Sequence, residues 1–120
     1  MARQDDAVDL EGFGRFSEPA LLILVSLASG PRHGYAIIQH VLEISGGRVR
    51  LPVGTLYGSL DRLAEQDLIE LDHEETVAGR PRRYFRLTGD GRQAVVAEAA
   101  RMQKAARLVL RHTAVRTATA

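Results

Sequence analysis

The sequence contains no cysteine, no tryptophan and, among its 16 basic residues, a single lysine, Lys104. Without cysteine the chain can form no disulfide, no thiolate zinc site and no cysteine nucleophile. Aromatic residues make up only 5% of the chain, so we expect a core of aliphatic and alanine side chains. A chain without cysteine suits a reducing compartment, and we predict a cytoplasmic protein.

Long hydrophobic runs are also missing. The longest, ALLILVSLA from Ala20 to Ala28, is much shorter than the ~20 residues that cross a bilayer. Glu18 and Pro19 precede it, where a secretion signal would carry positive charge. We therefore expect no targeting segment and no membrane partner.

The 120 residues, 45% of them hydrophobic and 26% charged, are typical of one globular domain with a small core. The formal net charge is only +1, but the charges are unevenly distributed. Residues 70–75, ELDHEE, are acidic, whereas residues 80–92 hold one acid, Asp90, and the arginines Arg80, Arg82, Arg83, Arg86 and Arg92. A partner that contacts one face of the protein responds to this local charge rather than to the total.

The residue pattern predicts three helices, a β-hairpin and a long final helix. The helices are expected over about residues 17–29, 34–46, 53–66 and 89–112, and the two short strands over 69–71 and 84–87. This order is typical of a mainly α fold with a small β-hairpin, a winged helix-turn-helix over residues 17–88 followed by a dimerisation helix over residues 89–112. Residues 1–16 are expected to form a flexible arm and residues 113–120 a frayed tail.

A winged helix-turn-helix binds DNA with its third helix in the major groove. The hairpin, or wing, lies next to the DNA backbone. Arg80 and Arg82 flank the predicted tip of the wing, from which they can reach phosphates or the minor groove, and Arg83 follows them. We therefore predict that the basic cluster forms a DNA-binding wing.

The predicted third helix has two different faces. Leucines spaced at i, i+4 and i+7 are expected to point inward, namely Leu56, Leu60 and Leu63. The opposite side presents two glycines and three charged residues, namely Gly54, Gly58, Asp61, Arg62 and Glu65. Thr55 and Tyr57 flank this side with hydroxyls suited to phosphate oxygens, and the glycines let the helix backbone approach DNA closely. We therefore expect sparse base recognition, with DNA shape and the wing supplying much of the discrimination.

The final helix carries apolar and small residues at alternating spacings of four and three, which is typical of a heptad seam. These residues are Val95, Ala99, Met102, Ala106, Val109 and Thr113. Since the helix is longer than the surface that a three-helix domain offers, we predict that it pairs with a second copy; packing on its own domain is the alternative. A two-fold dimer would present two recognition helices about 34–36 Å apart to a palindromic operator.

Three segments of the sequence resemble the signature segments of the PadR family of transcriptional regulators: PRHGYAI (31–37), GTLYGSLDRLAEQDLIE (54–70) and GRPRRYFRLTGDGR (79–92). The resemblance covers about residues 17–112, and the single C-terminal helix is similar to the short subclass. It implies a winged-helix repressor that is dimeric through its C-terminal helix and is often tuned by a small molecule. The residues that match are Tyr35 in the second helix, Tyr57 in the recognition helix and Gly79-Arg80 in the wing, whereas Gly58 stands where a larger residue is common.

The same resemblance implies a site for a small apolar effector near the dimer axis. Phe13, Phe16, Met102 and Val95 are the residues that could line it, with plain packing as the alternative for each.

No catalytic arrangement of residues is evident, and we predict that the protein is not an enzyme. The sequence has no serine elbow and no glycine-rich phosphate loop between a strand and a helix. His40 and Glu43 stand at i and i+3 on a helix, but no third ligand accompanies them, so we expect neither a metal nor a cofactor. The main alternative to a DNA-binding regulator is a winged-helix module that binds other proteins, which Asp61 and Glu65 on the exposed side of the third helix would suit.

Overall fold

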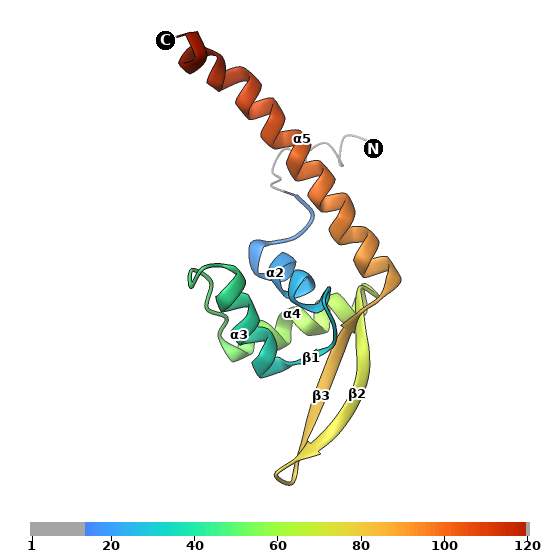
Figure 1. The fold of residues 1–120 in the computed structure, drawn as a ribbon. Coiled ribbons are helices and arrows are strands. Elements are labelled where there is room, and N and C mark those ends of the chain that lie inside the picture. Colours follow the sequence, from blue (N-terminus) through green and yellow to red (C-terminus); the bar gives the residue numbers. More distant parts are fainter. Residues whose placement is uncertain (1–13, 120) are drawn as a thin grey trace. The chain divides into compact units, whose positions relative to one another are not determined.

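The computed structural model describes the backbone of residues 14–119 and the side chains of residues 14–113. Along the chain this part forms α2 (Glu18–Leu27), β1 (Arg32–His33), α3 (Gly34–Ile44), α4 (Val53–Glu65), β2 (Ile69–Val77), β3 (Arg80–Leu87) and α5 (Gly89–Thr119) (Figure 1). The elements confirm the predicted fold class, a mainly α winged helix-turn-helix followed by a long C-terminal helix.

These elements belong to two compact units. Residues Phe16–Val95 form one of them, which we call the winged-helix unit. Residues 14–15 and the described part of α5 from Val96 onward belong to the other.

The core of the winged-helix unit is aliphatic, as the composition predicted. Helix α2 contributes Ile23 and Leu24, both completely buried, and packs against α3. One face of α3 and one face of α4 contribute further buried apolar side chains, namely Ile37, Val41, Leu56, Leu60 and Leu63. The inward face predicted for the third helix is therefore correct.

Side chains that precede α2 and α3 define where these helices begin. The Ser17 hydroxyl accepts a hydrogen bond from the Ala20 N–H at 3.3 Å and so acts as the N-cap of α2. At the start of α3, the Nδ1 atom of His33 accepts a hydrogen bond from the Ala36 N–H at 3.4 Å. Helix α4 begins after Pro52 without a side-chain cap.

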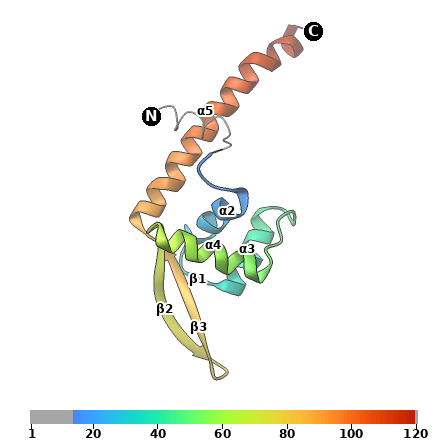
Figure 2. The ribbon, with the colours of Figure 1, turned by 180° about the vertical axis from the view of Figure 1, so that it is seen from behind.

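The sheet has three antiparallel strands in the order β1-β3-β2. The two residues of β1 pair with the middle of β3, where Arg32 lies opposite Phe85 and His33 opposite Tyr84. Strands β2 and β3 form the wing, which extends away from α2, α3 and α4 (Figures 1 and 2).

The strands of the wing are longer than the sequence predicted, and β1 was not predicted at all. Residues 72–77 and 80–83, expected to form a loop, continue the ladder to a two-residue turn. That turn consists of Ala78 and Gly79, both with positive φ angles of 52° and 77°, as in the tight turns that match strand twist. The outer wing was missed because its residues are polar and exposed on both faces, so no apolar alternation reveals a strand.

Helix α5 begins at a set of contacts around Thr88. Its hydroxyl accepts a hydrogen bond from the Gly91 N–H at 2.9 Å and donates one to the Asp67 carbonyl at 2.7 Å. The helix continues past His112, its predicted end, to Thr119, since the sequence after Gly91 contains no glycine or proline to stop it.

Two further expectations concern the N-terminal arm and the absence of a membrane-spanning helix. Of the arm predicted over residues 1–16, only residues 14–16 are described, and Phe13 lies outside them. The helices between residues 14 and 119 include none whose length and hydrophobicity would allow it to cross a membrane.

Candidate nucleic-acid interface

The surface of α4 matches the prediction made for a recognition helix. Four of the residues expected on its outer side are exposed, namely Gly54, Asp61, Arg62 and Glu65, and Gly58 is half-buried. Thr55 is exposed and Tyr57 has an exposed fraction of 43%. Space beside Gly54 is open, because a Cβ atom built there would meet no atom within 4 Å.

A groove of about 610 Å³ separates the start of α3 from the wing. It is lined by His33, Gly34, Tyr35, Tyr57, Glu74, Val77, Ala78, Arg80, Pro81, Arg82 and Arg83. Five residues that the sequence analysis assigned to DNA binding thus lie together, although they come from α3, α4 and β3. Gly79 adjoins them in the turn, whereas Gly54, Thr55, Gly58 and Arg62 lie outside the lining of the groove.

Gly34 allows α3 and α4 to approach each other at this groove. A Cβ atom at Gly34 would lie 2.5 Å from the Tyr57 hydroxyl and 3.3 Å from Leu56. The missing side chain therefore makes room for Tyr57, whose hydroxyl points toward the first turn of α3. This role of Gly34 was not predicted, because a glycine at the start of a helix does not indicate which side chain will pack against it.

His33 lines the groove and also contacts the wing. Its ring meets the Tyr84 ring edge-on, with the two centroids 5.2 Å apart. Burial, followed by the charge of Arg82, lowers the pKa of His33. A neutral ring suits its position, since the Nδ1 atom that caps α3 must keep its lone pair.

The wing carries both signs of charge because the acidic β2 pairs with the basic β3. Glu74 lies opposite Arg83, and Glu75 lies opposite Arg82. The two charged segments are visible in the sequence, but their pairing is not, since it depends on the register of the hairpin.

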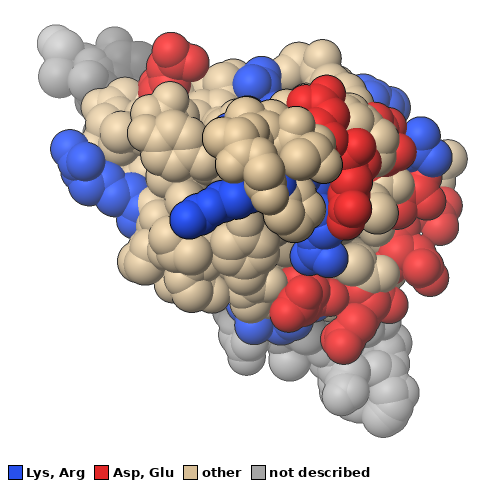
Figure 3. Space-filling model, turned by 90° about the horizontal axis from the view of Figure 1, so that it is seen from below, with Lys and Arg blue, Asp and Glu red and all other residues tan. Residues whose placement is uncertain are grey.

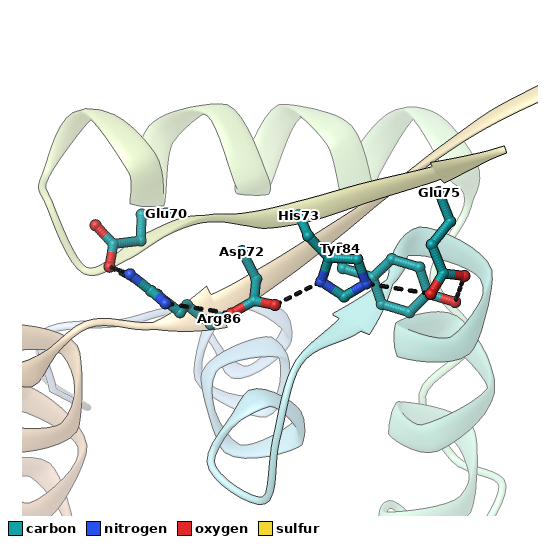
Figure 4. A network of polar contacts seen from close by, with 6 residues as sticks. All are labelled: Glu70, Asp72, His73, Glu75, Tyr84 and Arg86. Carbon is teal, nitrogen blue, oxygen red and sulfur yellow. Dashed lines mark hydrogen bonds and ion pairs between the residues drawn. The ribbon is translucent and has the colours of Figure 1, made fainter.

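A polar network runs along the outer face of the wing (Figure 4). Arg86 forms ion pairs with Glu70 at 2.7 Å and with Asp72 at 3.3 Å. Asp72 is the extra residue of a β-bulge between Leu71 and His73, and it also contacts the His73 Nδ1 atom at 2.5 Å. Arg86 is thus occupied by carboxylates within the wing.

The network continues through His73 to Tyr84 and Glu75. The rings of His73 and Tyr84 stack with centroids 4.3 Å apart, and the Tyr84 hydroxyl donates to Glu75 at 3.2 Å. The hydrogen bond to Asp72 raises the pKa of His73, and that contact in turn lowers the pKa of Asp72.

The five arginines of residues 80–92 therefore have different surroundings. Arg80, Arg82 and Arg83 line the groove, whereas Arg86 pairs with acids and Arg92 donates to the Ala28 carbonyl at 3.3 Å. The space-filling view from below shows basic side chains separated from one another and most of the acidic ones on one side (Figure 3). Of the five arginines that are close together in the sequence, only Arg80, Arg82 and Arg83 therefore lie together at the groove.

The residues predicted for the dimer seam and the effector site are found in both units. Val95 and Phe16 are half-buried and pack against the core of the winged-helix unit, which is the plain packing given above as the alternative for each. Ala99, Met102, Ala106 and Val109 are exposed in the other unit. Their roles in dimerisation and in effector binding stay predictions.

The described residues contain no group of three or more metal-ligating side chains. His40 Nδ1 is buried without a hydrogen-bond partner, and no third ligand joins His40 and Glu43.

Three helices, a two-residue strand and a basic-tipped hairpin define a winged helix-turn-helix protein. Residues 23–97 match the Transcriptional regulator PadR-like family, and the chain therefore belongs to this family of transcriptional regulators. Its members are regulators rather than enzymes, which confirms the prediction.

Two relatives and one solved structure are also similar to this chain. It is 37% identical over 90 residues to the transcriptional regulator Rv3488 of Mycobacterium tuberculosis, a match that covers 75% of this chain and 80% of that one. It is 40% identical over 90 residues to an uncharacterized 37.1 kDa protein in transposon TN4556 of Streptomyces fradiae, covering 75% of this chain but only 24% of that protein's length. The structure of Bacillus subtilis PadR in complex with operator DNA has the same fold, with a TM-score of 0.61 at 20% identity over 69% of this chain and 47% of that chain.

Proposed function

We propose that the chain is a dimeric repressor that binds a palindromic operator, with α4 in the major groove and the wing against the DNA backbone. A small apolar effector would release it. The family and the operator-bound Bacillus subtilis PadR support DNA binding, and the effector rests on the family resemblance alone.

One observation carries the DNA-binding proposal. The groove brings Tyr35 from α3, Tyr57 from α4 and Arg80, Arg82 and Arg83 from β3 to one surface of the winged-helix unit. Planar guanidinium groups and phenolic hydroxyls are suited to phosphate oxygens. A DNA backbone that follows the groove would meet all five side chains.

Binding to DNA from upstream of its own gene, measured by mobility shift at two salt concentrations, tests this proposal. Several phosphate contacts predict a loss of affinity of ~10³-fold or more between about 50 and 200 mM salt. The Arg80→Ala/Arg82→Ala variant should bind more weakly and show a shallower salt dependence, because each lost phosphate contact reduces the slope by about 1.

The matched control is Arg107→Ala/Arg111→Ala, which removes the same charge from exposed positions of α5. It should retain most of the affinity of the wild type. Equal losses in the two double variants would show that only total charge matters and would contradict a role for the wing.

A second candidate is a winged-helix module that binds other proteins. Exposed Asp61 and Glu65 on α4 favour it, because carboxylates repel a DNA backbone. A dimer that shows no salt-dependent binding to any duplex in a random-sequence library would support this candidate instead.

A further inference from the structure

Val53, the first residue of α4, is a branched apolar side chain with an exposed fraction of 62%. Among the large hydrophobic side chains described in the winged-helix unit, only Tyr35 is more exposed. A single exposed valine is ordinary on a protein surface, so its position must decide whether it has a role.

That position is the first turn of the recognition helix, whose N-terminal residues contact base edges in helix-turn-helix proteins. Gly54 follows directly, and the space where its side chain would lie is open. Gly58, on the next turn of the same side, also lacks a side chain, and the Arg62 guanidinium lies 3.6 Å from where its Cβ atom would be. Because neither glycine has a side chain, neither would keep the start of α4 away from the floor of the major groove.

Two of the longer side chains of α4, Tyr57 and Arg62, make contacts within the protein. The Tyr57 hydroxyl lies against Gly34 at the start of α3. An Arg62 Nη2 atom lies 3.5 Å from the Ser59 hydroxyl on its own helix. Val53 and Thr55 therefore remain as the first-turn side chains that face solvent.

Valine has no hydrogen-bonding group on its side chain, which restricts what it can recognise. Base pairs present donors and acceptors in the major groove, and the thymine 5-methyl group is the apolar feature of the four bases there. We infer that Val53 is a specificity-determining residue that contacts the 5-methyl group of a thymine in each half of the operator. This inference rests on the proposed function, since it requires α4 to lie in the major groove.

Replacing thymine by deoxyuridine removes this methyl group and leaves the hydrogen-bonding edge unchanged. The operator to use is a duplex that the wild-type chain selects from a random-sequence library. Each thymine is then replaced in turn, and affinities are measured for the wild type and for Val53→Ala. Val25→Ala, an exposed valine of α2, serves as the control, and thermal unfolding verifies that both variants fold.

For the wild type, replacing one symmetric pair of thymines should weaken binding by about fourfold per methyl group, the value of burying one such group. The same replacement should have almost no effect on Val53→Ala, whereas Val25→Ala should respond like the wild type. If every replacement affects the wild type and Val53→Ala equally, the inference is wrong although DNA binding stands. If the wild type selects no duplex at all, the proposed function fails and this inference fails with it.

Discussion

At Gly91 the first turn of α5 lies directly against the chain that leaves α4. A Cβ atom at this position would be 2.1 Å from the Leu68 carbonyl oxygen, and that oxygen already accepts a hydrogen bond from the Thr88 N–H. The Leu68 oxygen is a backbone atom, so it cannot move aside as the end of a flexible side chain would.

Gly91→Ala should therefore lower the free energy of unfolding by about 1–3 kcal/mol, the usual cost of overpacking a tight contact. Urea denaturation measures this loss. Gly89→Ala, two residues earlier, is the control, because a Cβ atom there meets nothing within 4 Å. Its effect should stay within about 0.5 kcal/mol, and a similar loss in both variants would contradict the contact.

Single residues also show what the sequence could not predict. The faces of α4 followed from the spacing of its leucines, since a helix period is visible in the sequence. The contact of Gly34 with Tyr57 and that of Gly91 with Leu68 depend on how distant segments pack. A glycine in a sequence does not reveal which atom occupies the space beside it.

At the scale of the elements, the two strands of the wing are linked by ion pairs and hydrogen bonds between titratable side chains. His73 contacts Asp72 and Glu75, with Arg86, Glu70 and Tyr84 in the same network. The raised pKa of His73 means that its contribution to stability is present below the ordinary value of about 6.5 and is lost as the pH rises through the raised value. The lowered pKa of Asp72 means that its contribution is present above its ordinary value of about 3.9 and is lost as the pH falls through the lowered value.

An NMR titration of the His73 ring should accordingly give a midpoint above about 6.5 in the wild type. In Asp72→Asn the midpoint should fall, because the carboxylate that favours the imidazolium ion is gone. His33 supplies the internal comparison, as its midpoint should lie below the ordinary value. An unchanged His73 midpoint in the variant would contradict the pairing of these two residues.

The hairpin itself illustrates the limit of pattern-based prediction for elements. Tyr84 to Leu87 was identified because three of its four residues, Tyr84, Phe85 and Leu87, are aromatic or aliphatic. The outer residues have no buried face, and what they present instead is opposite charges across the ladder, such as Glu74 and Arg83. Such pairs cannot be identified before the register is known.

At the scale of the whole molecule, the central prediction is the dimer. Met102 and Val109 lie on the predicted seam of α5 and have exposed fractions of 47% and 58%. Leu108 is similarly exposed but lies on the opposite side of the helix, since its position falls outside the heptad seam.

Met102→Glu and Val109→Glu should each weaken dimerisation by at least about tenfold, because an unpaired carboxylate would be buried at the seam. Leu108→Glu adds the same charge and should leave the dimer intact. Sedimentation velocity over a range of concentrations measures the three constants. A larger effect of Leu108→Glu would place the interface on the other face of α5.

The position of β2 at the edge of the sheet has a consequence for the protein in concentrated solution. An edge strand exposes unpaired backbone groups that invite the strand of another molecule. Along β2, however, the exposed or half-buried side chains include Glu70, Asp72, Glu74 and Glu75. Two copies meeting through this edge would bring like charges face to face, and β1 at the opposite edge offers only two residues for pairing. The acids that neighbour the wing arginines therefore also protect the protein against growth into an intermolecular sheet.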